Sequence, residues 1–72
     1  MSKKALQILL AKNTRALRVS LGYSQEQLAH HCGLHRTYIG SIERGEKNVT
    51  LNTLYVLAQA FGTTVPELLS EK

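Results

Sequence analysis

The sequence predicts an all-α fold in which five helices form a single domain over residues 1–72. Apolar residues recur at the three- and four-residue spacing of amphipathic helices, and capping residues or glycines stand between these stretches. No run of alternating apolar and polar residues is long enough to predict a strand. Because a chain of 72 residues has room for about one hydrophobic core, we expect one domain and no second one.

A stripe of apolar residues predicts a first helix over residues 2–21, which Gly22 ends. An amphipathic helix buries such a stripe and exposes its charged side, and most of the basic residues here lie outside the stripe. Thr14 is in phase with the apolar positions. The residues that we expect to face the core are Leu6, Leu10, Thr14, Leu17 and Leu21.

Two short helices joined by a glycine turn come next. Ser24 and Gln27 have the spacing of a capping box, which predicts the start of a second helix that ends at Gly33. A third helix is expected over residues 35–44, with Gly45 as its stop. Its inward pair is Ile39 and Ile42. The residues left largely on its outer side are Arg36, Thr37, Gly40, Ser41 and Arg44.

Two further helices complete the predicted fold. Thr50 caps a fourth helix that Gly62 ends, and Thr64 caps a short last helix. Pro66 stands in the first turn of that last helix, where the missing N–H of a proline is not needed. The inward residues expected in the fourth helix are Leu51, Leu54, Leu57, Ala58 and Phe61, and those in the last helix are Leu68 and Leu69.

Residues 24–45 have the order of a helix-turn-helix, two short helices separated by a glycine turn. This stretch resembles the lambda-repressor-like (XRE-type) family of phage repressor and Cro proteins, and within it most of all the controller proteins of restriction-modification systems. The likeness extends over about residues 10–69. It is carried by four motifs: Leu-Gly-Tyr-Ser-Gln-Glu, Arg-Thr-Tyr-Ile, Ile-Glu-Arg-Gly and Gly-Thr-Thr-Val-Pro-Glu-Leu-Leu.

The resemblance implies a function and a binding mode. Members of this family are sequence-specific transcriptional repressors or activators that bind palindromic operators as homodimers, with the third helix in the DNA major groove. Similarity to the controller proteins further implies autoregulatory control of a restriction-modification operon. We therefore expect double-stranded DNA and a second copy of the chain as partners.

The third helix carries three candidate base-reading residues, Arg36, Thr37 and Ser41. The guanidinium of Arg36 can donate two hydrogen bonds to guanine O6 and N7, worth about 1–3 kcal/mol against a wrong base. Thr37 suits thymine or a polar base edge, and Gly40 would allow a close backbone approach. The alternative for Arg36 is a solvated surface charge, which is the fate of most arginines.

Five residues are expected to contact the DNA backbone: Gln25, Tyr38, Arg44, Lys47 and Asn48. Gln25 stands where a helix start offers free N–H groups to a phosphate, and the family places a phosphate-binding glutamine there. It is otherwise an ordinary first-turn residue. Tyr38 either donates to a phosphate or packs its ring on the second helix. Arg44, Lys47 and Asn48 follow the reading residues and would be solvated in the free protein.

Other residues are expected to form a salt bridge between helices and a dimer interface. In similar domains a salt bridge between the first and third helices sets the recognition helix, and here it pairs Arg18 with Glu43. A homodimer interface is expected at the last helix and the end of the fourth. Val65, Leu68 and Leu69 are more apolar residues than so short a last helix can bury inside its own domain. The alternative is that Leu68, and Val65 with it, completes the core. We expect Leu68 to face inward.

Composition indicates which class of partner the protein binds and in which cellular compartment it works. The net charge of +4 favours a polyanionic partner such as nucleic acid. A single cysteine cannot make an internal disulfide and no signal peptide precedes the first helix, so we expect a cytoplasmic protein. No apolar stretch approaches the ~20 residues that cross a bilayer.

We expect no metal, cofactor, small-molecule ligand or enzymatic activity. His30, His31, Cys32 and His35 are residue types that bind zinc, but adjacent histidines on a helix point apart and Gly33 breaks the helix before His35. Cys32 is more consistent with a small core residue. The acidic residues are scattered, and no nucleophile–base set is present.

Two other functions stay open at this point. The first is an antitoxin-type protein, whose DNA-binding domain also binds a protein partner, although no extension for such a partner is visible. The second is a metal or redox sensor that uses Cys32 and the histidines. A Cys32→Ser protein with unchanged DNA binding would exclude that second function.

Overall fold

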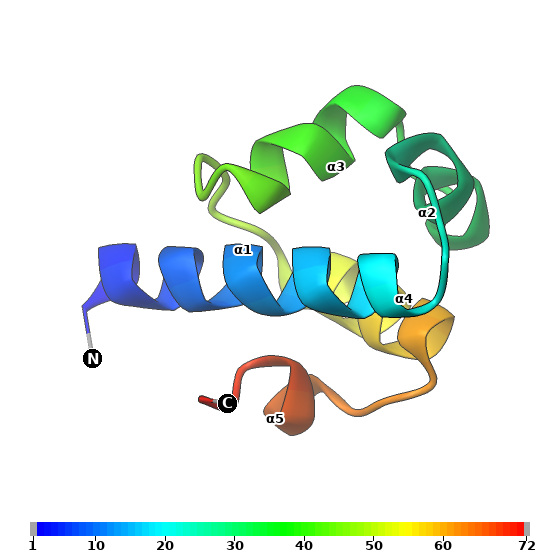
Figure 1. Ribbon diagram of the computed structural model, residues 1–72. Helices are drawn as coiled ribbons and strands as arrows, with labels where there is room; N and C mark the ends of the chain where they lie inside the picture. Colours follow the sequence, from blue (N-terminus) through cyan, green and yellow to red (C-terminus); the bar gives the residue numbers. More distant parts are fainter. Residues whose placement is uncertain (1, 72) are drawn as a thin grey trace.

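The computed structural model describes residues 2–71, which form five α-helices joined by short turns (Figure 1). This result confirms the all-α prediction and its number of helices. The helices are α1 (Lys3–Ser20), α2 (Gln25–Cys32), α3 (Arg36–Glu43), α4 (Leu51–Phe61) and α5 (Val65–Leu68). In Figure 1 α1 crosses the middle of the molecule, with α3 on one side of it and α5 on the other.

The predicted caps fix where the helices begin and end. Ser24 Oγ accepts the N–H of Gln27 at 3.0 Å, and Gln27 Oε1 accepts the N–H of Ser24 at 2.8 Å, which completes the capping box. Thr50 and Thr64 cap α4 and α5 in the same way, through the N–H groups three residues on. At the far end of α2, Gly33 has a φ of 69°, a left-handed conformation that glycine adopts without strain.

All five helices contribute to one core. Its fully buried side chains include one leucine each from α2, α4 and α5 and two isoleucines from α3. Burial of each such side chain stabilises the fold by roughly 1.5–3 kcal/mol. They are Leu28, Leu57, Leu68, Ile39 and Ile42. The core thus fixes α3 by its inner face and leaves the opposite face of that helix outside.

The prediction that the whole apolar stripe of α1 faces the core was wrong at both ends of the stripe. Leu6 and Leu21 are 40% and 47% exposed, whereas Leu10 and Thr14 are buried as expected. The N-terminal part of α1 extends beyond the helices that cover its middle (Figure 1), and Leu21 lies in the turn after the helix. Periodicity gives the inward side of a helix, but it does not give the length over which other helices cover that side.

Leu51 is a second correction, because it was expected to face the core with the other apolar residues of α4. It is 83% exposed. Leu51 is the first residue of α4 and comes before the part of the helix that packs. The remaining four predicted positions, Leu54, Leu57, Ala58 and Phe61, are buried.

Asn13 joins α1 to the C-terminal segment. Its Nδ2 donates to the carbonyl oxygens of Leu68 and Ser70, each at 2.8 Å, and the asparagine is itself buried. A helix as short as α5 leaves its carbonyls without partners inside the helix, so a side chain from α1 supplies the donors. This contact holds α5 against α1.

Candidate nucleic-acid interface

A polar network fixes α3 relative to α1. Arg18 Nε donates to Glu43 Oε2 at 2.6 Å and Arg18 Nη2 donates to Glu43 Oε1 at 3.1 Å, which gives the two-point geometry of a strong ion pair. Arg18 Nη1 also donates to the carbonyl oxygen of Tyr23 at 2.8 Å. The hydrogen bond to Glu43 raises the pKa of Arg18. The predicted salt bridge is therefore present, and it also holds the turn before α2.

Gln25 extends this network to the start of α2. Its Nε2 donates to Glu43 Oε1 at 3.1 Å, although the residue as a whole is exposed. The first turn of α2 is thereby tied to the last residue of α3. Glu43 thus links α1, α2 and α3 through one buried carboxylate.

Gly40 has a different role from the one expected. It was placed on the outer side of α3, open to a close approach, but it is buried. A Cβ at this position would lie 3.1 Å from Arg44 Nη1 and 3.5 Å from Gln25 Oε1. The side chains of Arg44 and Gln25 pass over the glycine and cover it. They can lie this close because glycine has no side chain.

The three predicted base-reading residues lie on the outer side of α3 but differ in their contacts. The side chain of Arg36 is 68% exposed, and its nearest carboxylate is Glu26 at 3.9 Å. An exposed ion pair at that distance is worth little, so the guanidinium is available. Thr37 is exposed, and Ser41 is half-buried with its Oγ donating to the carbonyl oxygen of Thr37 at 3.1 Å.

His35 arranges the start of α3. It is the N-cap, and its Nδ1 accepts the N–H of Thr37 at 3.1 Å and contacts the hydroxyl of Thr37. In the sequence analysis, His35 was considered only as a metal-binding residue type and was not connected with Thr37. The position of the histidine directly before the helix was the available signal.

Three of the five residues predicted to contact the DNA backbone, Arg44, Lys47 and Asn48, come directly after α3. Arg44 Nε donates to Glu46 Oε2 at 2.9 Å, and Arg44 Nη2 donates to Glu46 Oε1 at 3.3 Å. Lys47 Nζ lies 5.8 Å from the ring centroid of Tyr38, which packs partly against the core. Asn48 is exposed in the loop that follows. Glu46, which sequence reasoning left unassigned, lies among these cations.

The residues proposed for a dimer contact divide into two kinds. Leu68 is fully buried within its own domain, so it is not available to a partner. Val65 and Leu69 are half-buried at the edge of the core. Two larger apolar surfaces were not predicted, those of Leu51 and Tyr55, which are 83% and 56% exposed one turn apart on α4.

The histidines and the cysteine of α2 have structural surroundings. The ring of His31 lies 4.7 Å from that of Tyr23, centroid to centroid, and Cys32 Sγ contacts the carbonyl oxygen of Val56 at 3.8 Å. Burial raises the pKa of the Cys32 thiol. Over residues 2–71, no three side chains of the metal-binding types lie close enough together to hold an ion. No helix in that range is long and apolar enough to span a bilayer.

The arrangement of α2 and α3 matches a known family. A helix-turn-helix family model matches residues 15–68, which include every residue of the Glu43 network. The chain belongs to the helix-turn-helix family. It is a DNA-binding transcriptional regulator, and its relatives in this family are control proteins and regulators rather than enzymes.

Two relatives of this helix-turn-helix chain are control proteins. The chain is 58% identical over 64 residues to the control protein C.SmaI of Serratia marcescens, with 89% of this chain and 76% of the relative covered. It is 42% identical over 65 residues to the control protein C.BamHI of Bacillus amyloliquefaciens, with 89% and 80% covered. Both alignments extend well beyond the helix-turn-helix itself.

Solved structures give the same result. The restriction-modification controller protein C.AhdI from Aeromonas hydrophila superimposes with a TM-score of 0.84 at 41% identity, covering 89% of this chain and 97% of that chain. A hypothetical transcription factor from Neisseria superimposes with a TM-score of 0.88 at 40% identity, covering 97% and 80%. The five-helix arrangement is therefore shared over nearly the whole domain.

Proposed function

We propose that this regulator controls a restriction-modification operon, its own gene included, by binding a palindromic operator as a homodimer in the cytoplasm. The similarity to C.SmaI, C.BamHI and C.AhdI supports the operon assignment, because all three are control or controller proteins. The observation that carries the DNA-binding geometry is the outer side of α3, which the Glu43 network fixes in place and which presents Arg36 at its start.

In this proposal α3 enters the major groove with its first turn leading. Arg36 donates to a guanine edge, and Thr37 and Ser41 contact neighbouring base edges or a thymine methyl. An eight-residue helix is about 12 Å long, so one copy reads only a few base pairs. A second copy on the same operator supplies the missing selectivity.

Backbone contacts set the register of α3 in the groove. Gln25 places the start of α2 at a phosphate, where N–H groups and the helix dipole favour negative charge. Tyr38, Arg44, Lys47 and Asn48 contact phosphates on the other side of the reading residues. These contacts hold the domain on the duplex and carry no sequence information themselves.

The homodimer contact in this proposal uses the outer side of α4 and the end of α5. Leu51 and Tyr55 are exposed there, and Val65 and Leu69 are half-buried. Leu69 and Leu6 of α1 line one hollow beside α4, whose other lining residues include the polar Lys3, Lys47 and Asn48. Large apolar side chains that are exposed one turn apart, such as Leu51 and Tyr55, are what a partner covers.

Footprinting on DNA upstream of the chain's own coding sequence tests the proposed function. We expect protection of two half-sites whose centres lie about 10–10.5 base pairs apart, or a multiple of that spacing. Uniform protection along the fragment, or none, would contradict autoregulation. Protection that needs a second protein encoded beside it would support the antitoxin-type alternative instead.

A further inference from the structure

The side chain of Glu46 occupies the fork of Arg44 directly after α3. Two nitrogen–oxygen contacts join them, of 2.9 and 3.3 Å, and both side chains are more than half exposed. Arg44 Nη2 also lies 3.4 Å from Ser41 Oγ, so the guanidinium lies back along the outer side of the helix. The pair therefore stands beside the predicted reading residues.

Two further cations lie near enough to act on the same carboxylate through their charge. Lys47 follows Glu46 in the chain, and Lys4 comes from the first turn of α1. The hydrogen bond from Arg44 is the main reason that the pKa of Glu46 is lowered, and the charges of Arg44, Lys47 and Lys4 lower it further. Lys4 is brought here because Gly45, with a φ of 72°, turns the chain back against the backbone of α1.

This ion pair contributes little to the stability of the fold. An exposed arginine–carboxylate pair is worth about 0–1 kcal/mol, because water competes with it and both side chains lose freedom. The geometry of the pair instead indicates a binding site for an anion. The arginine fork that binds two carboxylate oxygens can also bind two phosphate oxygens. The Arg44 fork, with the charges of Lys47 and Lys4 nearby, therefore has the chemistry that a phosphate needs.

We propose that Arg44, Lys47 and Lys4 form a subsite for a DNA phosphate and that the carboxylate of Glu46 occupies it in the free protein. The inference rests on the proposed placement of α3 in the groove. DNA must displace Glu46 from Arg44 before the phosphate binds. Glu46 therefore lowers the affinity for every duplex, whatever its sequence, because a phosphate contact does not distinguish bases. The subsite also adds α1 to the DNA-binding surface.

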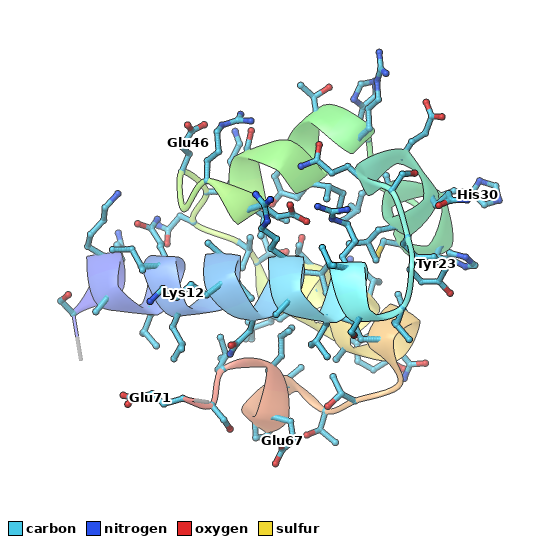
Figure 2. The ribbon with its side chains drawn as sticks, viewed as in Figure 1. Lys12, Tyr23, His30, Glu46, Glu67 and Glu71 are labelled. Carbon is cyan, nitrogen blue, oxygen red and sulfur yellow. The ribbon has the colours of Figure 1, made fainter. Side chains whose placement is uncertain are left out.

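A comparison of two carboxylate substitutions tests this subsite. Glu46→Gln removes the competing charge, and Glu71→Gln makes the same change in net charge elsewhere. Figure 2 shows Glu46 beside the end of α3 and Glu71 on the opposite side of α1. The affinity of each protein for a duplex of random sequence is measured over a range of salt concentrations.

We expect Glu46→Gln to bind the random duplex about three- to tenfold more tightly than the native protein, with a salt dependence steeper by about 0.9 in log–log slope for one added phosphate contact. Glu71→Gln should change the affinity less than about twofold and leave the slope unchanged. Equal effects of the two substitutions would overturn the proposal, because they would reflect net charge alone. Thermal unfolding confirms that both variants are folded.

Lys4 gives an independent test of the same subsite. In the Glu46→Gln protein, Lys4→Gln should remove part of the gained affinity and restore the shallower slope. Lys12, which is also exposed on α1, is the control, and Lys12→Gln should do neither. Equal effects of the two lysines would exclude Lys4 from the subsite. If the native protein selects an operator but Glu46→Gln does not raise the affinity for DNA, the subsite is contradicted and the proposed function is not. If Glu46→Gln raises the affinity but the native protein selects no operator, the proposed function is contradicted and the subsite is not.

Discussion

The guanidinium of Arg18 and the carboxylate of Glu43 form a two-point ion pair that joins α1 to α3. Their side chains are only 13% and 4% exposed, so this pair differs in kind from the exposed pair of Arg44 and Glu46. Glu43 also accepts from Gln25, which means that one buried carboxylate sets the relative positions of the reading helix and of the start of α2.

Arg18→Ala is expected to destabilise the domain by about 3 kcal/mol, because it leaves the carboxylate of Glu43 buried without its charged partner. DNA binding should weaken with it, although Arg18 is not a proposed DNA contact. Urea unfolding of the variant measures the loss. Arg15→Ala on the same helix is the matched control, since Arg15 is exposed. Equal unfolding midpoints for the two variants would contradict the structural role of the pair.

Thr14→Val should raise the stability of the domain by about 1 kcal/mol. The side chain of Thr14 is fully buried, and its hydroxyl has no hydrogen-bond partner among residues 2–71. Replacing that hydroxyl by a methyl group removes an uncompensated desolvation cost at nearly the same volume. Thr53→Val is the control and should lower stability, because the hydroxyl of Thr53 accepts a hydrogen bond from Thr50 at 3.1 Å. A less stable Thr14→Val protein would show that the hydroxyl is bonded.

Asn13→Asp should loosen the C-terminal segment. A carboxylate has no hydrogen to donate, so the carbonyls of Leu68 and Ser70 lose their shared donor and face a negative charge. We expect a loss of about 1–3 kcal/mol in the free energy of unfolding. Amide hydrogen exchange in α5 should quicken more than exchange in α2. Unchanged exchange in α5 would mean that core packing of Leu68 alone holds that helix.

Tyr55→Glu should weaken self-association at least tenfold, because it places a charge at the centre of the proposed dimer contact. Sedimentation equilibrium measures the dissociation constant. Val19→Glu on α1 is the matched control, since Val19 is 58% exposed and Tyr55 is 56% exposed. Identical dissociation constants for the two variants would place the dimer contact elsewhere.

The features that the sequence predicted well depend on local interactions. The capping box at Ser24, the glycine ends of α2 and α4 and the inward pair of α3 each involve residues within a few positions of one another. Such signals need no knowledge of the other helices. The resemblance to the controller proteins added the Arg18–Glu43 pair, which joins residues 25 positions apart.

The features that the sequence did not predict depend on how the helices pack. Whether Leu51 is covered depends on where α4 meets its neighbours, and the burial of Gly40 depends on two side chains that cross it from other positions. Asn13 shows the same limit, because its partners lie 55 and 57 positions away in the chain. An asparagine in the middle of a helix is a weak signal of a tertiary contact, but neither its burial nor its partners could be inferred from the sequence.

Selection of bound sequences from a pool of random duplexes, at one fixed salt concentration, tests the central claim most directly. The native protein should select a palindromic consensus, and Arg36→Ala should lose the preference at one position in each half-site, where Arg36 contributes about 1–3 kcal/mol. A consensus that is unchanged by Arg36→Ala, or the absence of any selected sequence, would contradict base reading by the start of α3.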